Sequence, residues 1–234
     1  GRIRTDTGTL LRGLPLPLGY GGMRFHSAWG RIAFVGYAHD LRRLPSRSGA
    51  TDAEVAAVLP GDDLVPDATD VVDRAATLDA PPSEVWPWLV QLGKKRAGWY
   101  FPRRVEAMLP RRGRGLRHID PVWQALAPGE DIPDYGPGTP VFRAATVDPR
   151  RALVYLSLRD RANGHRWPAD GRADRPGVLA LSWALVLTDL DGRTRLHIRL
   201  RLRVKHSWLA AAGGLFDWLT IQGLFAGLRE RLAQ

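Results

Sequence analysis

The chain has 234 residues and 44% apolar side chains, which suffice for the core of one large domain or of a domain with an appendage. It contains no cysteine, so disulfides, thiolate nucleophiles and cysteine-ligated zinc or iron–sulfur sites are excluded. The formal net charge is +10, but only three of the 34 basic residues are lysines, a bias typical of a GC-rich genome that weakens any argument for an anionic partner.

Residues 1–50 carry eight arginines and two aspartates, with a Gly/Pro-rich stretch over 13–22. They hold no apolar run near 18 residues and no cleavage-site pattern, so neither a membrane span nor a signal peptide is predicted there. We predict an N-terminal extension of unknown role over 1–50, which packs on the core or docks on an anionic surface, and a ligand-binding domain over 51–234.

Two segments of the chain carry opposite charge. Residues 51–73 carry seven carboxylates and no basic residue, whereas residues 94–117 carry nine basic residues, so we expect the two blocks to attract each other. Thr51 and Glu54 have the spacing of a capping box, which predicts a short helix that ends near Leu59.

A strand, a helix and an aromatic loop are predicted in succession over 71–100. The β-type run 71–78 is followed by Pro81 and Pro82, which suit a helix start, and by Glu84, whose charge suits the first turn. A helix of about ten residues should follow. A second, shorter helix over 103–109 is expected to end at Pro110.

Four further strands are predicted over 140–147, 152–158, 178–187 and 194–204. The last of them alternates apolar and polar residues without a break, which indicates one buried face and one wet face. Leu196, Ile198, Leu200 and Leu202 are predicted to point inward. The outward set, which includes His197 as a solvated residue, is Arg195, His197, Arg199, Arg201 and Arg203.

Residues 208–228 are apolar nearly all round, with Asp217 as the only charge. At about 1.5 Å per residue, such a helix is long enough to span a bilayer. One apolar stripe runs at helical spacing along it: Leu215, Trp218, Ile221, Phe225 and Leu228. Gly223 and Gly227 form a GxxxG pair, which leaves room for close packing or for a ligand.

Five segments in order resemble the SRPBCC superfamily, which comprises START-like, Bet v 1-like and polyketide cyclase-like proteins: 77–100, 121–133, 147–154, 182–196 and 224–231. The resemblance covers roughly 51–234, close to four fifths of the chain. It implies an α+β helix-grip fold, in which a curved antiparallel sheet wraps a long C-terminal helix around an internal apolar cavity. In such a fold the last helix lies across the concave face of the sheet, and we favour this interpretation of 208–228 over a membrane span.

A cavity between sheet and helix would be lined by apolar residues, with a few polar groups to orient a ligand. Trp99 and Tyr100 follow a glycine and resemble the aromatic loop of the family, where they would form a rim of the cavity. The predicted ligand-binding residues are Trp99, Tyr100, Trp183, Leu215, Trp218, Ile221 and Phe225.

Catalytic signatures are few. The chain has no GxSxG elbow, HExxH motif, P-loop or strand-coupled GxGxxG, and no histidine pair at a helical spacing, so no metal and no cofactor is expected. One local cluster has residue types that transfer protons. His118 and Asp120 face the same side of an extended segment, and Tyr135 lies a short distance downstream; these three are the catalytic candidates.

Two functions stay open. We expect the protein to bind a small apolar or amphipathic molecule, either as a metal-free cyclase- or dehydratase-like tailoring enzyme or as a non-catalytic carrier or sensor of lipid, isoprenoid or polyketide. An anionic membrane surface is a further candidate partner, and we expect the protein in the cytoplasm, either free or peripheral to the membrane. Nucleic acid is not expected, because the arginine-rich run over 111–115 comes with no nucleic-acid-binding motif.

Overall fold

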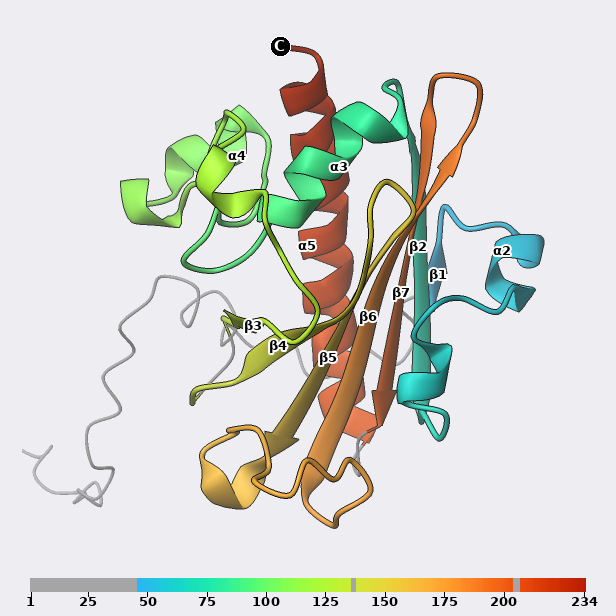
Figure 1. Cartoon of the computed structure of the whole chain (residues 1–234), viewed down its shortest axis with the longest axis vertical. Coiled ribbons are helices and arrows are strands. Elements are labelled where there is room, and N and C mark those ends of the chain that lie inside the picture. The colour runs from blue at the N-terminus through green and yellow to red at the C-terminus, as the bar shows by residue number, and fades with distance from the viewer. Residues whose placement is uncertain (1–45, 136–137, 204–206) are drawn as a thin grey trace, which may run out of the picture.

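The computed structural model describes residues 46–135, 138–203 and 207–234, and the side chains of the last segment from Trp218 onward (Figure 1). The predictions made for 1–45 therefore lie outside the described residues. A seven-stranded sheet has the order β1-β2-β7-β6-β5-β4-β3, with every neighbouring pair antiparallel except β1 and β2. The strands are β1 (Arg47–Ser48), β2 (Asp70–Leu78), β3 (Asp131–Pro133), β4 (Val141–Asp148), β5 (Ala152–Asp160), β6 (Val178–Asp189) and β7 (Thr194–Arg203).

Among the described residues, four α-helices accompany the sheet: α2 (Asp52–Ala56), α3 (Pro82–Gln91), α4 (Arg103–Met108) and α5 (Ser207–Leu232). Single 3-10 turns occupy 62–64, 111–113, 121–123 and 161–163. The long α5 runs along one face of the curved sheet, and α3 crosses its C-terminal half (Figure 1). This α+β architecture fits the helix-grip arrangement that the sequence predicted.

The local signals placed the elements well. The capping box is formed, since the Thr51 hydroxyl accepts from the Glu54 amide and the Glu54 carboxylate accepts from the Thr51 amide. The helix after it is shorter than predicted and ends at Ala56. The ten-residue α3 begins at the predicted prolines, and the predicted strands are found with shifts of at most two residues.

The inner face of the sheet and α5 enclose the main core. Ile221, Leu224, Phe225 and Leu228 of α5 are buried there with residues of β2, β5, β6 and β7. A Cβ on Gly223 would lie 2.4 Å from the Phe101 ring, so the GxxxG pair serves close packing against the chain that precedes α4. Within the described part of the chain, none of the helices combines the length and apolarity needed to cross a bilayer.

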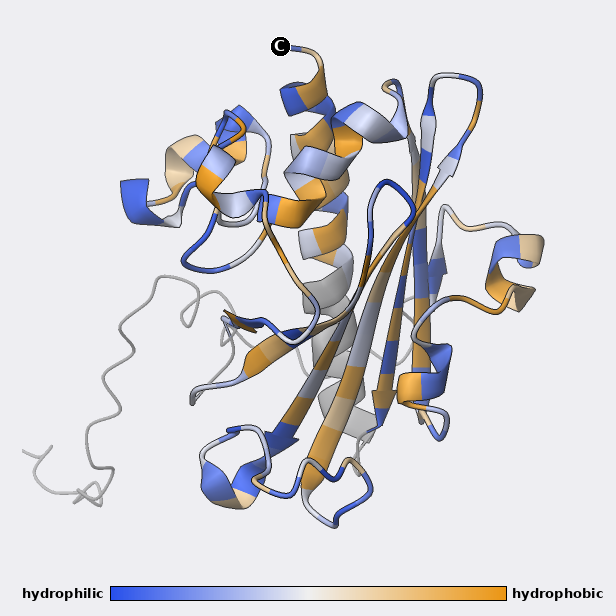
Figure 2. Cartoon of the chain, in the orientation of Figure 1, coloured by the Kyte–Doolittle hydropathy of each residue, from blue (hydrophilic) through white to orange (hydrophobic). Residues whose placement is uncertain are grey.

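The outer face of β7 differs from the prediction that its polar side chains are solvated. Blue and orange alternate along β7 in Figure 2, as predicted, but the polar face is not wet. His197 and Arg199 are 5% and 4% exposed, because residues 46–67 fold across this face of β2 and β7. The alternation of apolar and polar residues indicates which side of the sheet each side chain faces, but it does not indicate what covers that side.

Arg199 is the centre of this contact. Its Nε donates to the Asp73 carboxylate (2.8 Å), Nη1 to the Ala57 carbonyl and the Asp62 carboxylate, and Nη2 to the carbonyls of Glu54 and Val55. All five N–H groups of the guanidinium are thereby satisfied. His197 shares Asp73 through Nε2 at 2.8 Å.

The same face holds the rest of the acidic segment. Arg195 forms a two-bond ion pair with Glu54, Arg201 donates to the Val65 carbonyl, and Arg203 pairs with Asp67. The expectation that residues 51–73 pair with residues 94–117 is therefore wrong among the contacts described. The partner of the acidic segment is β7, which lies about 140 residues away in sequence.

Replacing Asp73 with alanine should lower the free energy of unfolding by about 3–5 kcal/mol, because it leaves Arg199 and His197 buried beside a missing acceptor. Chemical denaturation measures the change. The control is Asp63→Ala, since Asp63 is exposed in the same acidic segment and forms no ion pair among the described residues. Equal effects of the two substitutions would contradict the buried network.

Acid should weaken the attachment of residues 46–67 to the outer face of β7. The hydrogen bonds from Arg195 lower the pKa of Glu54 from 4.5 to about 2, against the opposing effect of burial. A lowered carboxyl pKa stabilises the fold above the unfolded value, and that contribution is lost as the pH falls from about 4.5 to about 2. We expect Arg195→Gln to reduce stability at neutral pH and to flatten its decline over this window. Thermal unfolding scans across the window test this, with exposed Arg193→Gln as the control.

Candidate functional site

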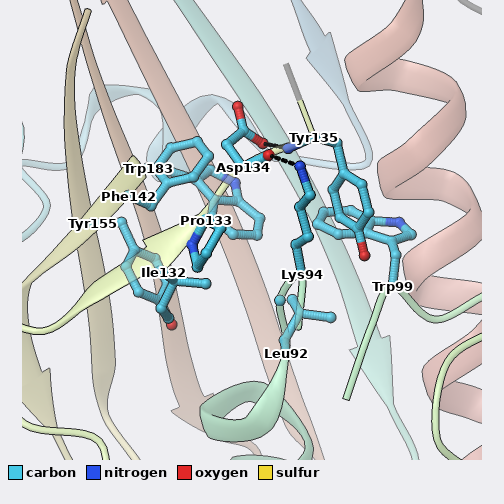
Figure 3. A pocket seen from close by; sticks show the side chains of 11 residues that line it. Leu92, Lys94, Trp99, Ile132, Pro133, Asp134, Tyr135, Phe142, Tyr155 and Trp183 are labelled. Atoms are coloured by element: carbon cyan, nitrogen blue, oxygen red, sulfur yellow. Dashed lines mark hydrogen bonds between the residues drawn. The ribbon is translucent and has the colours of Figure 1, made fainter. Parts of the chain in front are cut away.

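A small hollow opens between the inner face of the sheet and the loop that follows α3 (Figure 3). Its volume is about 40 Å³, room for one or two water molecules. We call it the aromatic hollow. Eleven residues line it: Leu92, Gly93, Lys94, Trp99, Ile132, Pro133, Asp134, Tyr135, Phe142, Tyr155 and Trp183.

Stacked rings form one wall of the hollow. The Trp183 ring lies at the centre. The centre of the Tyr155 ring is 5.8 Å from it on one side and the centre of the Trp99 ring 5.7 Å on the other, and both rings are nearly parallel to it. Phe142 packs against Trp183 at 6.0 Å. The register of β5 and β6 pairs Tyr155 directly with Trp183, which explains their contact.

Trp99 is held by its loop. Its indole Nε1 donates to the Thr220 carbonyl of α5 at 3.1 Å. A bridge between Gly93 and Gly98 closes the loop, and both glycines have positive φ. A Cβ on Gly98 would lie 3.2 Å from the Gly115 backbone, so this glycine also allows a close approach of two chain segments.

Polar groups occupy one edge of the hollow (Figure 3). The Lys94 ammonium donates to the Asp134 carbonyl at 2.7 Å, and Arg159 pairs with the Asp134 carboxylate at 2.7 Å. Lys94 lies 5.6 Å from the centre of the Tyr135 ring. Burial, and then the charge of Asp134, raise the pKa of Tyr135 to about 12, so its phenol stays protonated at neutral pH.

Tyr155 carries an unmet polar group. Its side chain is 2% exposed, and its hydroxyl has no hydrogen-bond partner among the described residues. The Nε of Arg96 is likewise buried without a partner among them. Burial raises the pKa of the Tyr155 phenol, which is therefore a neutral donor. Buried hydroxyls in proteins are normally paired, so an orphaned one marks a place for a ligand or an ordered water.

The predicted ligand-binding residues are divided between the hollow and the core. Trp99 and Trp183 line the hollow, and Trp218 is half-buried on α5. The others with described side chains lie in the core away from the lining: Tyr100, Ile221 and Phe225. The Tyr100 hydroxyl donates to the Trp88 carbonyl at 2.9 Å, and the Leu215 side chain lies outside the described residues.

The catalytic candidates are not assembled at the hollow. Tyr135 is in its lining, whereas His118 and Asp120 are not. His118 is exposed, and the Asp120 carboxylate accepts from the Val122 amide, which caps a 3-10 turn. The backbones of His118 and Asp120 are both bound to Gln91 of α3, so their loop is fixed in a supporting position.

Sequence reasoning missed much of the lining, notably Phe142 and Tyr155. Each sits in a predicted strand, and β-strand alternation puts Tyr155 on the same face as Leu153. What brings them to Trp183 is the pairing of β4 with β5 and of β5 with β6, including a register shift between Ala144 and Thr146. That pairing involves separate strands and leaves no local signal.

Comparisons with known proteins give a likeness of shape. No family model matches the chain, and no curated protein matches it. Protein MLL2253 from Mesorhizobium loti is 18% identical, with a TM-score of 0.41 over 70% of this chain and 96% of its own. Protein CV1439 from Chromobacterium violaceum is 15% identical, with a TM-score of 0.42 over 70% and 97%. The protein Ara h 8.0201 is 11% identical, with a TM-score of 0.40 over 70% and 97%.

Likenesses at these scores carry no argument about function, which therefore rests on the site. Among the described residues, no group of three or more histidine, aspartate or glutamate side chains is placed to hold a metal ion.

Proposed function

We propose that residues 51–234 form an SRPBCC-like domain that binds a small, flat, partly aromatic molecule in the aromatic hollow, without metal or cofactor. The observation that carries this proposal is the buried, unpartnered hydroxyl of Tyr155 beside a stack of aromatic rings. The hydroxyl is shut off from the hollow as it stands, so a ligand with a carbonyl or hydroxyl oxygen would accept this unmade hydrogen bond only after a wall of the hollow has moved.

The walls favour a flat ligand. Aromatic rings prefer offset stacking on other rings, and Trp183 already has such neighbours on both sides. The remaining lining is largely apolar, with Leu92, Ile132 and Phe142 in contact with the space. A polycyclic or polyketide-like aromatic matches this combination of a stacking surface, apolar walls and one buried donor.

The size of the hollow implies that a wall must move. Drug-sized ligands occupy roughly 300–1,000 Å³, whereas the hollow offers about 40 Å³. Trp99 stands on the loop that follows α3, and one hydrogen bond to α5 holds its indole. We propose that the ligand takes the place of Trp99 on Trp183, so that the loop over 93–99 opens to admit it.

Binding or transport of the ligand is favoured over its catalytic conversion. Of the three proton-transfer candidates only Tyr135 reaches the hollow, and its pKa of about 12 makes it a hydrogen-bond donor and prevents it from acting as a base at neutral pH. Tyr155 is restricted in the same way. A binding or sensing role needs only such donors, whereas a cyclase or dehydratase also needs a base that the lining does not supply as a free group.

The matched ligands 9-fluorenone and fluorene test the Tyr155 donor, because they differ in one carbonyl group. Tyr155→Phe should weaken fluorenone binding by about 2- to 10-fold, the value of one hydrogen bond, and leave fluorene unaffected. Quenching of tryptophan emission measures both affinities. Tyr100→Phe is the control, since that hydroxyl is already bound to Trp88. Equal losses for both ligands, or conversion of either ligand by the protein, would contradict a binding role through Tyr155.

Substitutions of Trp99 and Trp183 should change ligand affinity in opposite directions. Trp99→Ala opens space on Trp183 and should strengthen binding of either ligand several-fold, whereas Trp183→Ala removes the stacking surface and should weaken it by about tenfold. Isothermal titration measures the affinities, and circular dichroism confirms that both variants are folded. If neither the wild type nor Trp99→Ala binds any flat aromatic saturably, the hollow is not a ligand site.

A further inference from the structure

Helix α4 presents apolar side chains to solvent. Glu106 points from it into the protein, where it is 4% exposed and pairs with Arg231 at 2.7 Å and with Arg117 at 2.8 Å. At 100° per residue, the positions two before and two after Glu106 lie on the opposite side of the helix. These positions are Arg104 and Met108. Met108 is 85% exposed, and its neighbour Val105 is 40% exposed.

Basic residues adjoin these apolar residues in the sequence. Arg104, Arg111 and Arg112 are exposed, and their guanidinium groups form no ion pair among the described residues. The arginines of β7 differ, because Arg195, Arg199 and Arg203 each bind a carboxylate. The exposed cluster of Arg104, Val105, Met108, Arg111 and Arg112 is called the α4 patch.

The α4 patch is rigidly mounted. The Arg231 guanidinium reaches from α5 to the carbonyls of Phe101, Gly115 and Leu116, which flank α4 on both sides. Arg117 adds a bond to Glu230 of α5 at 3.3 Å. The lobe that carries α4 lies beside α3 and α5 (Figure 1). These bonds fix the orientation of α4 and keep the side chains of Val105 and Met108 on the solvent side.

We propose that the α4 patch docks the protein on a bilayer that contains anionic phospholipid. Arginine guanidinium groups bind phosphate oxygens, and basic residues close to an anionic leaflet add to the affinity. Met108 and Val105 would enter the interfacial region and bury apolar surface there. A nucleic acid would use the arginines, but it would gain nothing from an exposed methionine. This docking is independent of the ligand proposed for the aromatic hollow.

Vesicle co-sedimentation of the full chain tests the docking. Vesicles of phosphatidylcholine alone are compared with vesicles of roughly equal parts phosphatidylcholine and phosphatidylglycerol. The wild type should bind the anionic vesicles and release them at high salt. Each arginine near the surface is worth about fivefold in affinity, so Arg111→Gln/Arg112→Gln should weaken binding by about 25-fold. Met108→Ser should weaken it several-fold at unchanged net charge.

The control is Arg161→Gln/Arg193→Gln, which removes two exposed, unpaired arginines elsewhere on the described surface and lowers the net charge equally. It should leave binding within twofold of the wild type. The proposal is overturned if the control variant loses as much affinity as the patch variant, or if only deletion of residues 1–45 abolishes binding. It is also overturned if Met108→Ser has no effect while the patch arginines govern binding to single-stranded DNA.

Discussion

Arg199 lies between the outer face of the sheet and the segment that covers it, where an unsatisfied guanidinium would be very costly. The protein meets this constraint by giving each of its five N–H groups an acceptor, three of them carbonyls at the end of α2. The path of residues 54–62 is thereby fixed to β7. A pair of apolar surfaces would tolerate a shift of that segment, whereas this set of directed bonds does not.

Arg231 plays the corresponding part on the other side of the sheet. It is 3% exposed, and burial lowers the pKa of its guanidinium against the opposing effect of Glu106. It lies 4.3 Å from the centre of the Tyr100 ring and binds carbonyls on the loop that contains α4. The chain between Trp99 and Arg117 is thus attached to the end of α5. The aromatic hollow and the α4 patch both depend on that attachment, because this stretch of chain supplies Trp99 to one and α4 to the other.

The sequence was sufficient for elements whose signals are local. Capping residues and prolines placed α2 and α3, and periodicity placed β7 and its inward face, with Leu196 and Ile198 buried as predicted. It failed where the answer depends on a distant segment. His197 was predicted to be solvated because alternation cannot reveal the covering chain over 46–67, which lies far from β7 in sequence. Tyr155 was missed for a similar reason, since its place beside Trp183 follows from strand register, while Trp99 was found from a loop motif.

The two-residue β1 lies along the edge of the sheet and covers part of β2. It lies parallel to β2 and supplies the acceptor for the Asp73 amide through the Ser46 carbonyl at 2.8 Å. Gly49 then turns the chain away at a point where a Cβ would lie 2.2 Å from the Ala75 carbonyl. An open edge of the nine-residue β2 would be a template for strand addition by another molecule. By occupying the middle of that edge, β1 covers the part of β2 that another strand would otherwise pair with.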